Sequence, residues 1–166
     1  FTGLRIGAAT MKAFAHVFNK PMVGVSTLEA LAYNLPHNEI VVPMIDARRN
    51  RVYTAIYSWE DGMLKEVMAP DVLPMEDLIK RLMDFDELVV NGNGTLIHRE
   101  LLEKSLGKRV RFATMGQNMC RAASICELAR IKYDGGQVDD YFTLAPEYLR
   151  ESQAQRELRE KERQNS

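Results

Sequence analysis

The chain has 166 residues, of which 46% are hydrophobic and 27% are charged, the balance of an ordinary globular protein with one domain or two small ones. No apolar run approaches the roughly 20 residues that a membrane-spanning helix needs. The N-terminal stretch also has none of the regions of a signal peptide, so a cytoplasmic protein without membrane attachment is predicted. Its 22 basic and 23 acidic side chains give a net charge of −1, which argues against a chain that binds RNA by itself, because such binding usually needs a basic excess.

The N-terminal part of the chain predicts two helices with a short strand between them. Residues 3–19 contain no strong helix breaker beyond one glycine and predict a long helix. The apolar run over 22–25 is typical of a buried strand. Ser26 is followed three residues later by Glu29, the spacing of a capping box, which predicts the start of a second helix. A linker is predicted over 35–38.

The middle of the chain predicts an antiparallel group of strands. These cover residues 40–45, 51–59 and 63–68, and an Asp-Gly turn joins the last two. The strand over 51–59 alternates between two sets of side chains, one on each face. Pro43 has no N–H to donate, so its strand is predicted to lie at an edge or a bulge, at least locally.

The remainder predicts helices that alternate with short strands, which with the preceding strand group indicates an α/β fold. The expected helices cover 74–83, 95–106 and 114–133, and the expected strands cover 88–90 and 109–112. Thr114 and Gln117 have the spacing of a second capping box. Cys120 and Cys126 point to nearly opposite sides of the last helix. They are therefore interpreted as small buried residues that neither form a disulfide nor share a metal.

Four motifs, in the same order along the chain, resemble the TsaB/YeaZ family. The first is FTGLRIG, from Phe1, with Lys12 completing its extended form. The others are PMVGVSTLEALA over 21–32, IDARR over 45–49 with Val-Tyr shortly after it, and PEYLR over 146–150. The matches span almost the whole chain, so we identify the chain as a member of this family.

The resemblance implies an actin-like (ASKHA, RNase H-like) fold. Family members normally begin with a further segment that ends in Gly-Pro-Gly-Ser before the first motif. The expected organisation is therefore a truncated first subdomain over 1–36, an essentially complete second subdomain over 37–150, and a charged tail over 151–166. The tail has four basic and four acidic residues and is interpreted as a solvated helix or a frayed end rather than an RNA-binding arm.

The resemblance also implies a role as a non-catalytic scaffold subunit. TsaB-type proteins belong to the complex that installs threonylcarbamoyladenosine in tRNA next to the anticodon. The expected partners are a catalytic TsaD-type paralogue and a TsaE-type ATPase, with tRNA contacted only through the complex, and a homodimer is left open. The alternative function is that of an actin-like nucleotide-dependent enzyme or a peptidase-like hydrolase, although no histidine is placed by sequence as a base for Ser26 or Thr27.

No catalytic residue, metal or cofactor is predicted in this chain. The catalytic paralogue binds metal through a V-N-H-x-E-x-H motif, whose two histidine positions are occupied here by Thr27 and Leu31. Neither side chain can replace an imidazole nitrogen as a metal ligand. His16, His37 and His98 fall on different predicted elements, with no second ligand at metal spacing.

Two further motifs leave alternatives open. The turn Asn91-Gly92-Asn93-Gly94-Thr95 lies between a strand and a helix, where it could form a tight turn with Thr95 as N-cap or approach a nucleotide. No lysine follows it, so tight nucleotide binding is not expected. The second motif is an arginine cluster that could form a solvated turn with local salt bridges or meet an acidic partner or RNA phosphates: Arg48, Arg49 and Arg51, beside Asp46.

The first helix is predicted to be a subunit interface because its polar residues form only a narrow stripe. Arg5, Lys12, His16 and Asn19 fall within that stripe, and the rest of the circumference is apolar. A single packing partner cannot cover so wide an apolar arc, so another chain or a preceding segment of the same chain should cover the remainder. The predicted interface residues are Leu4, Arg5, Ala8, Met11, Lys12, Ala15 and Phe18. The face with Leu4, Met11 and Phe18 should be covered by another chain or left unusually exposed.

Overall fold

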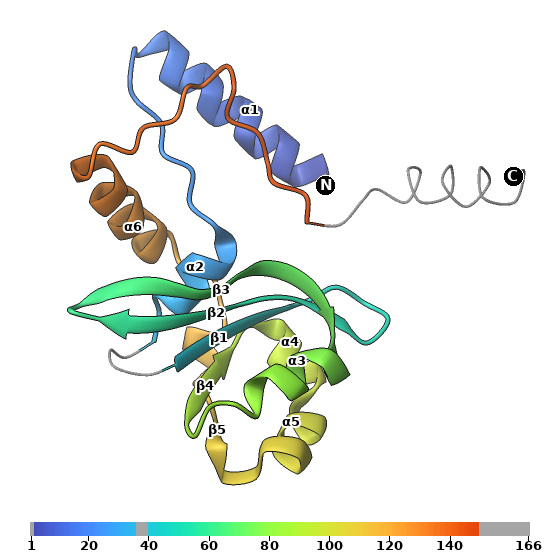
Figure 1. The fold of residues 1–166 in the computed structure, drawn as a ribbon. Coiled ribbons are helices and arrows are strands. Elements are labelled where there is room, and N and C mark those ends of the chain that lie inside the picture. Colours follow the sequence, from blue (N-terminus) through green and yellow to red (C-terminus); the bar gives the residue numbers. More distant parts are fainter. Residues whose placement is uncertain (1, 36–39, 150–166) are drawn as a thin grey trace, which may run out of the picture.

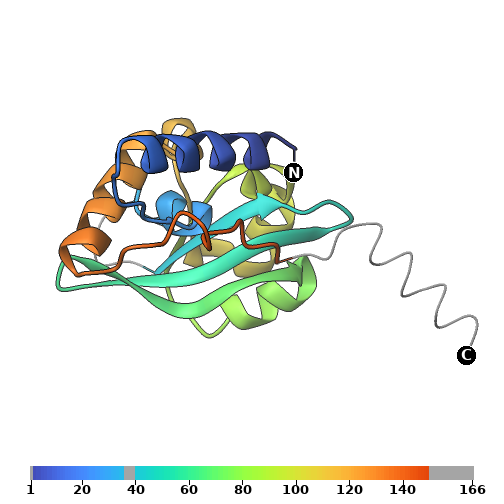
Figure 2. The ribbon, with the colours of Figure 1, turned by 90° about the horizontal axis from the view of Figure 1, so that it is seen from above.

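The computed structural model describes residues 2–35 and 40–149 (Figure 1). The predicted tail over 151–166 and most of the predicted linker over 35–38 therefore lie outside the described residues, as does His37. Helix α1 (Thr2–Val17) lies at one end of the molecule, and helices α3, α4 and α5 lie on the opposite side of the sheet from it (Figures 1 and 2). Short helix α2 (Thr27–Ala32) and helix α6 (Ala122–Asp134) lie between α1 and the sheet.

Within the described residues, one five-stranded sheet with the order β3-β2-β1-β4-β5 organises the fold. Strands β1 (Ile40–Asp46), β2 (Arg51–Glu60) and β3 (Met63–Pro74) are antiparallel neighbours, as predicted. Strands β4 (Leu88–Asn91) and β5 (Val110–Phe112) extend the sheet in parallel with β1. The antiparallel group followed by alternating helices and strands confirms the predicted α/β class.

Of the two positions predicted for Pro43, at a sheet edge or at a bulge, the sheet edge is wrong. Its strand β1 is the central strand, and Pro43 pairs in parallel register with Asn91 of β4. On its other side, Val41 of β1 pairs with Tyr57 of β2, and the next paired residue of β1 is Met44, opposite Thr54. The register of β2 with β3 shifts next to this interval, between Thr54 and Ile56. A proline is therefore tolerated inside this sheet where the neighbouring pairing is irregular.

Both faces of the sheet are buried, and the alternation in β2 decides which residues contribute to each face. Val52 and Ile56 belong to one core cluster, and Ala55 and Tyr57 belong to the other, as predicted. Helices α3 (Met75–Leu82) and α5 (Arg99–Leu106) cover the first face. The second face is covered by α2, and each large apolar side chain buried in this way contributes about 1.5–3 kcal/mol.

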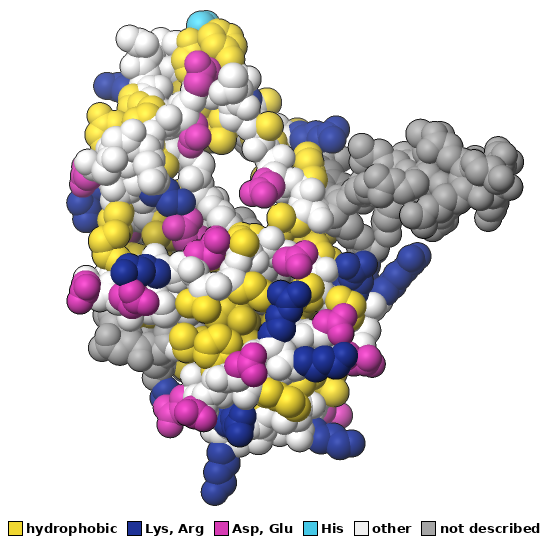
Figure 3. Space-filling model, in the orientation of Figure 1, with side chains coloured by type: hydrophobic (Ala, Val, Ile, Leu, Met, Phe, Trp, Pro, Cys, Tyr) yellow, Lys and Arg dark blue, Asp and Glu magenta, His cyan; other side chains and the backbone are white. Residues whose placement is uncertain are grey.

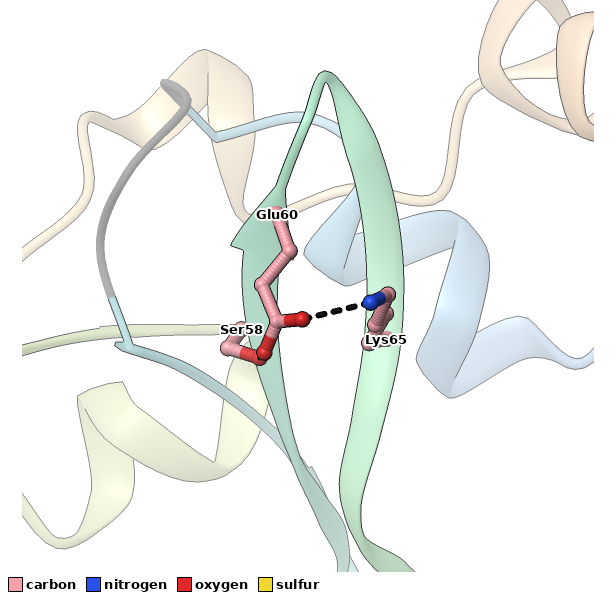
Figure 4. A network of polar contacts seen from close by, with 3 residues as sticks. All are labelled: Ser58, Glu60 and Lys65. Carbon is pink, nitrogen blue, oxygen red and sulfur yellow. Dashed lines mark hydrogen bonds and ion pairs between the residues drawn. The ribbon is translucent and has the colours of Figure 1, made fainter.

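The β2–β3 hairpin carries an exposed ion pair at its end (Figure 4). The Lys65 ammonium donates to Glu60 at 2.6 Å, and the Ser58 hydroxyl donates to the same carboxylate at 3.2 Å. The ammonium, and secondarily the Ser58 hydroxyl, lower the pKa of Glu60.

Two predicted helices have different boundaries in the structure. The helix predicted over 95–106 is divided at His98 into α4 (Asn93–Ile97) and α5. The predicted capping box at Thr114 and Gln117 is present, but it closes the short 3₁₀ turn η2 (Met115–Gln117) rather than a long helix. A second 3₁₀ turn, η1 (Gly107–Arg109), precedes β5.

The interpretation of both cysteines as buried is wrong, because Cys120 and Cys126 are exposed. Helix α6 begins only at Ala122, so Cys120 lies in the connection that precedes it. The two thiols therefore do not share one helix, and the periodicity argument that placed them does not apply.

The strand predicted over 22–25 does not form. Met22 makes only an isolated bridge with Asp139, and Gly24 donates its N–H to the Asp139 carboxylate at 2.6 Å. The capping box predicted at Ser26 is also wrong: Ser26 is the N-cap of α2 but makes no side-chain cap bond. The Glu29 carboxylate pairs instead with Lys132 of α6.

Candidate functional site

Helix α1 presents large apolar side chains to solvent. The exposed fractions are 54% for Leu4, 62% for Ile6, 56% for Met11, 52% for Phe14, 73% for Val17 and 63% for Phe18. We call these six residues the α1 apolar surface. Large apolar patches that remain exposed on a folded domain commonly mark interaction sites. Leu4, Met11 and Phe18 are exposed in this chain, which is one of the two predicted alternatives. The partner that would cover them stays a prediction.

The polar stripe of α1 faces the C-terminal segment of the same chain. Arg5 donates from Nε to the Tyr148 hydroxyl at 3.1 Å, and this bond raises the pKa of the guanidinium. His16 Nδ1 lies 3.1 Å from the Tyr141 hydroxyl, and their rings are 5.3 Å apart. The two ends of the helix are therefore joined to a segment more than a hundred residues later in the chain.

The seven predicted interface residues thus separate into two groups. Ala15 is buried, Ala8 and Lys12 are half-buried, and Arg5 is bonded to Tyr148. The three remaining members, Leu4, Met11 and Phe18, belong to the exposed surface. Three further exposed residues of this surface were not among the predicted interface residues, although the wide apolar arc of the helix already indicated them. They are Ile6, Phe14 and Val17.

A cavity of about 680 Å³ lies beneath α1. Its walls come from α1 at Leu4 and Ala8, from residues 24–28, from the sheet, and from the C-terminal residues 144–149. Figure 3 shows an opening between the α1 end of the molecule and the sheet. The lining is mainly apolar, with Lys132, Asp139 and Glu147 as its charged side chains.

The positions that correspond to the paralogue's metal ligands have other roles in this chain. Thr27 is exposed, whereas Leu31 is buried in the core. Glu29, between them, forms a half-buried ion pair with Lys132 of α6 at 2.6 Å. Within the described ranges 2–35 and 40–149, no cluster of three His, Cys, Asp or Glu residues could hold a metal ion.

The backbone groups of Gly92, in the glycine-rich turn after β4, are engaged in hydrogen bonds within the chain. The Gly92 N–H donates to the Asn118 side chain at 2.9 Å, and the Thr95 hydroxyl donates to the Gly92 carbonyl at 2.7 Å. Gly92 has φ of 94°, and a Cβ there would collide with the Met44 carbonyl. Thr95 is inside α4, whose N-cap is Gly92, so the N-cap role predicted for Thr95 is wrong. Close packing against β1 therefore explains why a glycine occupies position 92.

The arginine cluster lies at the turn between β1 and β2. Arg48 and Arg49 are exposed, and Arg51 is half-buried with its Nη2 donating to the Val72 carbonyl at 2.8 Å. Among the described residues Asp46 forms no ion pair with a guanidinium, and its Oδ1 accepts the backbone N–H of Arg48 at 2.8 Å. The predicted local salt bridges are therefore not formed within the described part of the chain.

The mixed sheet with a core on each face fits the actin-like fold of the ASKHA class, to which the structural and family matches point. Two solved structures from Pseudomonas aeruginosa share this fold. One is a crystal structure of a protein described by its similarity to peptidase YeaZ, at TM-score 0.69 and 24% identity over 90% of this chain and 68% of that one. The other is described as YeaZ, at TM-score 0.69 and 24% identity over 89% of this chain and 69% of that one. No helix among the described residues is long and apolar enough to cross a membrane.

Sequence comparisons place the chain within this class. Residues 1–158 match the family model described as TsaD, tRNA N6-adenosine threonylcarbamoyltransferase. The tRNA threonylcarbamoyladenosine biosynthesis protein TsaB of Bacillus subtilis is 32% identical over 93% of this chain, and that of Haemophilus influenzae is 27% identical over 90%. The matches cover 67% and 65% of those two relatives, about two thirds of their lengths. The chain belongs to the TsaB/YeaZ family.

Proposed function

We propose that this protein acts in the formation of threonylcarbamoyladenosine in tRNA, as a non-catalytic subunit that pairs with a TsaD-type catalytic paralogue and works with a TsaE-type ATPase. Its relatives are named for biosynthesis of this modified nucleoside. The observation that carries the pairing is the α1 apolar surface. Helix α1 and Phe18, which directly follows it, carry six large apolar side chains that are at least half exposed, the composition of one half of a helix–helix interface.

The geometry around the paralogue's metal motif supports a non-catalytic role. Glu29 is held by Lys132, and the two positions that carry histidine in the paralogue are a threonine and a leucine. A chain without the ligands would depend on its partner for metal chemistry, and ATP and tRNA chemistry would likewise belong to the partners.

A peptidase-like or nucleotide-dependent activity is the competing proposal, because one solved relative is described by its similarity to a peptidase. A hydrolase would need a base within hydrogen-bond reach of its nucleophile. Here His16 contacts Tyr141 and Phe142 rather than Ser26 or Thr27. The Gly92 N–H in the glycine-rich turn is already bonded to an internal partner, which disfavours a phosphate cradle.

The test is a charge placed on the α1 apolar surface. Met11→Glu should abolish co-purification with the TsaD-type paralogue, because an interface that desolvates Met11 would bury an unpaired carboxylate. Met63→Glu is the matched control, since Met63 is 55% exposed and Met11 is 56% exposed, and Met63 lies on the remote β2–β3 hairpin.

Both variants should keep the same circular dichroism spectrum and unfolding midpoint as the unchanged chain, because neither side chain is part of the core. A complex that survives Met11→Glu would refute the proposed interface. Loss of a self-associated dimer, with no effect on the paralogue, would show instead that α1 pairs two copies of this chain.

A further inference from the structure

The turn between β1 and β2 has an unusual backbone. Three consecutive residues adopt left-handed conformations, with φ of 61° at Arg48, 54° at Arg49 and 56° at Asn50. Residues with a Cβ are sterically disfavoured there, and asparagine is the most tolerant of these three. Such conformations persist only where the surrounding structure enforces them, and they concentrate at binding and catalytic sites.

The surroundings do enforce this turn. The Asp46 carboxylate accepts the Arg48 N–H at 2.8 Å, and the Asn50 carbonyl accepts the Met75 N–H at the start of α3 at 3.0 Å. The Asn93 side chain in turn accepts the Asp46 N–H at 3.1 Å. The turn is thereby fixed to both α3 and the glycine-rich turn, so its backbone and the Cα–Cβ directions of its residues are set before any ligand arrives.

The two arginines at this turn have guanidinium groups free to bind. Arg48 and Arg49 are exposed, and the described residues supply no ion pair to either one. Arg51 differs, because its guanidinium is half-buried and donates to a backbone carbonyl of β3. Arginine binds phosphate oxygens through two parallel N–H donors, and a fixed turn reduces the entropy lost on binding.

We propose that the β1–β2 turn is an RNA contact, in which Arg48 and Arg49 bind phosphate groups of the tRNA backbone. The choice of RNA over an acidic protein rests on the proposed function, which supplies tRNA as the anionic partner. With a net charge of −1 the chain has no general attraction for RNA, so a local contact of this kind must be pre-organised. The proposal departs from the expectation that tRNA is met only through other subunits.

The test replaces both arginines by glycine, which removes the guanidinium groups and relieves the left-handed strain. Binding of an unmodified tRNA transcript to the intact chain is measured by fluorescence anisotropy from about 50 mM salt upward, where phosphate contacts are strongest. Arg48→Gly with Arg49→Gly should weaken binding about tenfold and flatten the slope of log affinity against log salt by about 1.4, for two contacts. The unfolding midpoint should stay equal or rise, because glycine prefers this backbone.

The charge-matched control is Lys20→Ala with Lys108→Ala, which removes two exposed cations elsewhere and should leave the tRNA affinity within about twofold, because screened distant charges contribute little. Equal losses in the two double variants, no loss in the turn variant, or no salt-dependent tRNA binding by the unchanged chain would each overturn the proposal. A turn variant that binds tRNA normally but no longer pairs with the TsaD-type protein would overturn it in favour of an acidic protein surface. Pairing itself is tested by Met11→Glu, so failure of the RNA contact leaves the proposed function standing.

Discussion

The ionisation of Glu60 is set by its neighbours on the hairpin. Lys65 lowers the pKa of this carboxyl below its ordinary value of 4.5, so its contribution to stability is present above that value and is lost as the pH falls through the lower folded pKa. Lys65→Gln should therefore return the Glu60 pKa toward 4.5, as followed by carbon-detected NMR titration. Both side chains are about half exposed, so the unfolding midpoint at neutral pH should change little. An unchanged Glu60 pKa in this variant would contradict the assignment.

Gly92 is required by two separate constraints, and Gly107 by one. Gly92 has φ of 94° and approaches the Met44 carbonyl, whereas Gly107 has φ of 57° and a Cβ there would meet no other described residue within 4 Å. Gly107→Ala should cost about 1 kcal/mol through backbone strain alone, and Gly92→Ala should cost about 3 kcal/mol or more, because β1 and the turn must also move apart. Urea unfolding of both variants measures the difference, and equal costs would show that the Met44 contact relaxes freely.

At the scale of whole elements, hydrophobic patterning and local motifs differ in how far they predict this structure. The alternation in β2 correctly assigns side chains to two cores, because burial of both faces fixes the register. The capping box at Thr114 forms, but a local motif specifies a first turn and not the length of the helix that follows. The edge position predicted for Pro43 is wrong because the cost of a proline depends on the partner strands, and these come from distant sequence.

The candidate sites show the same division between pattern and tertiary contact. The apolar circumference of α1 predicts an exposed interaction surface without any knowledge of its partner. By contrast, no periodicity could show that Arg5 and His16 contact Tyr148 and Tyr141, since these contacts join the two ends of the chain. The left-handed turn at Arg48 could not be predicted from sequence either, because arginine is not among the residue types enriched in that conformation.

Over the whole molecule, a small polar cluster joins the α2 region to the sheet and to the approach to α6. Asn91, fully buried at the end of β4, donates from Nδ2 to the carbonyls of Leu31 at 2.7 Å and Gln117 at 2.9 Å. Asn34, just beyond α2, donates to the Met119 carbonyl at 2.8 Å and accepts the Ser124 hydroxyl at 2.6 Å. Because α1 is connected to the rest through α2 and the C-terminal segment, this cluster helps to set where the α1 apolar surface is presented.

Asn91→Leu should therefore loosen the α2 region from the sheet. The substitution keeps the volume similar but removes both donated hydrogen bonds, so the free energy of unfolding should fall by about 2 kcal/mol or more. In hydrogen exchange, amides of α2 should lose protection more than those of α3, which packs on the opposite face of the sheet. Asn93→Leu is the control, because Asn93 is exposed and accepts a single hydrogen bond from Asp46 N–H, so its cost should be smaller. Equal loss of protection in α2 and α3 would show that Asn91 supports the core as a whole and does not act as a specific link between the α2 region and the sheet.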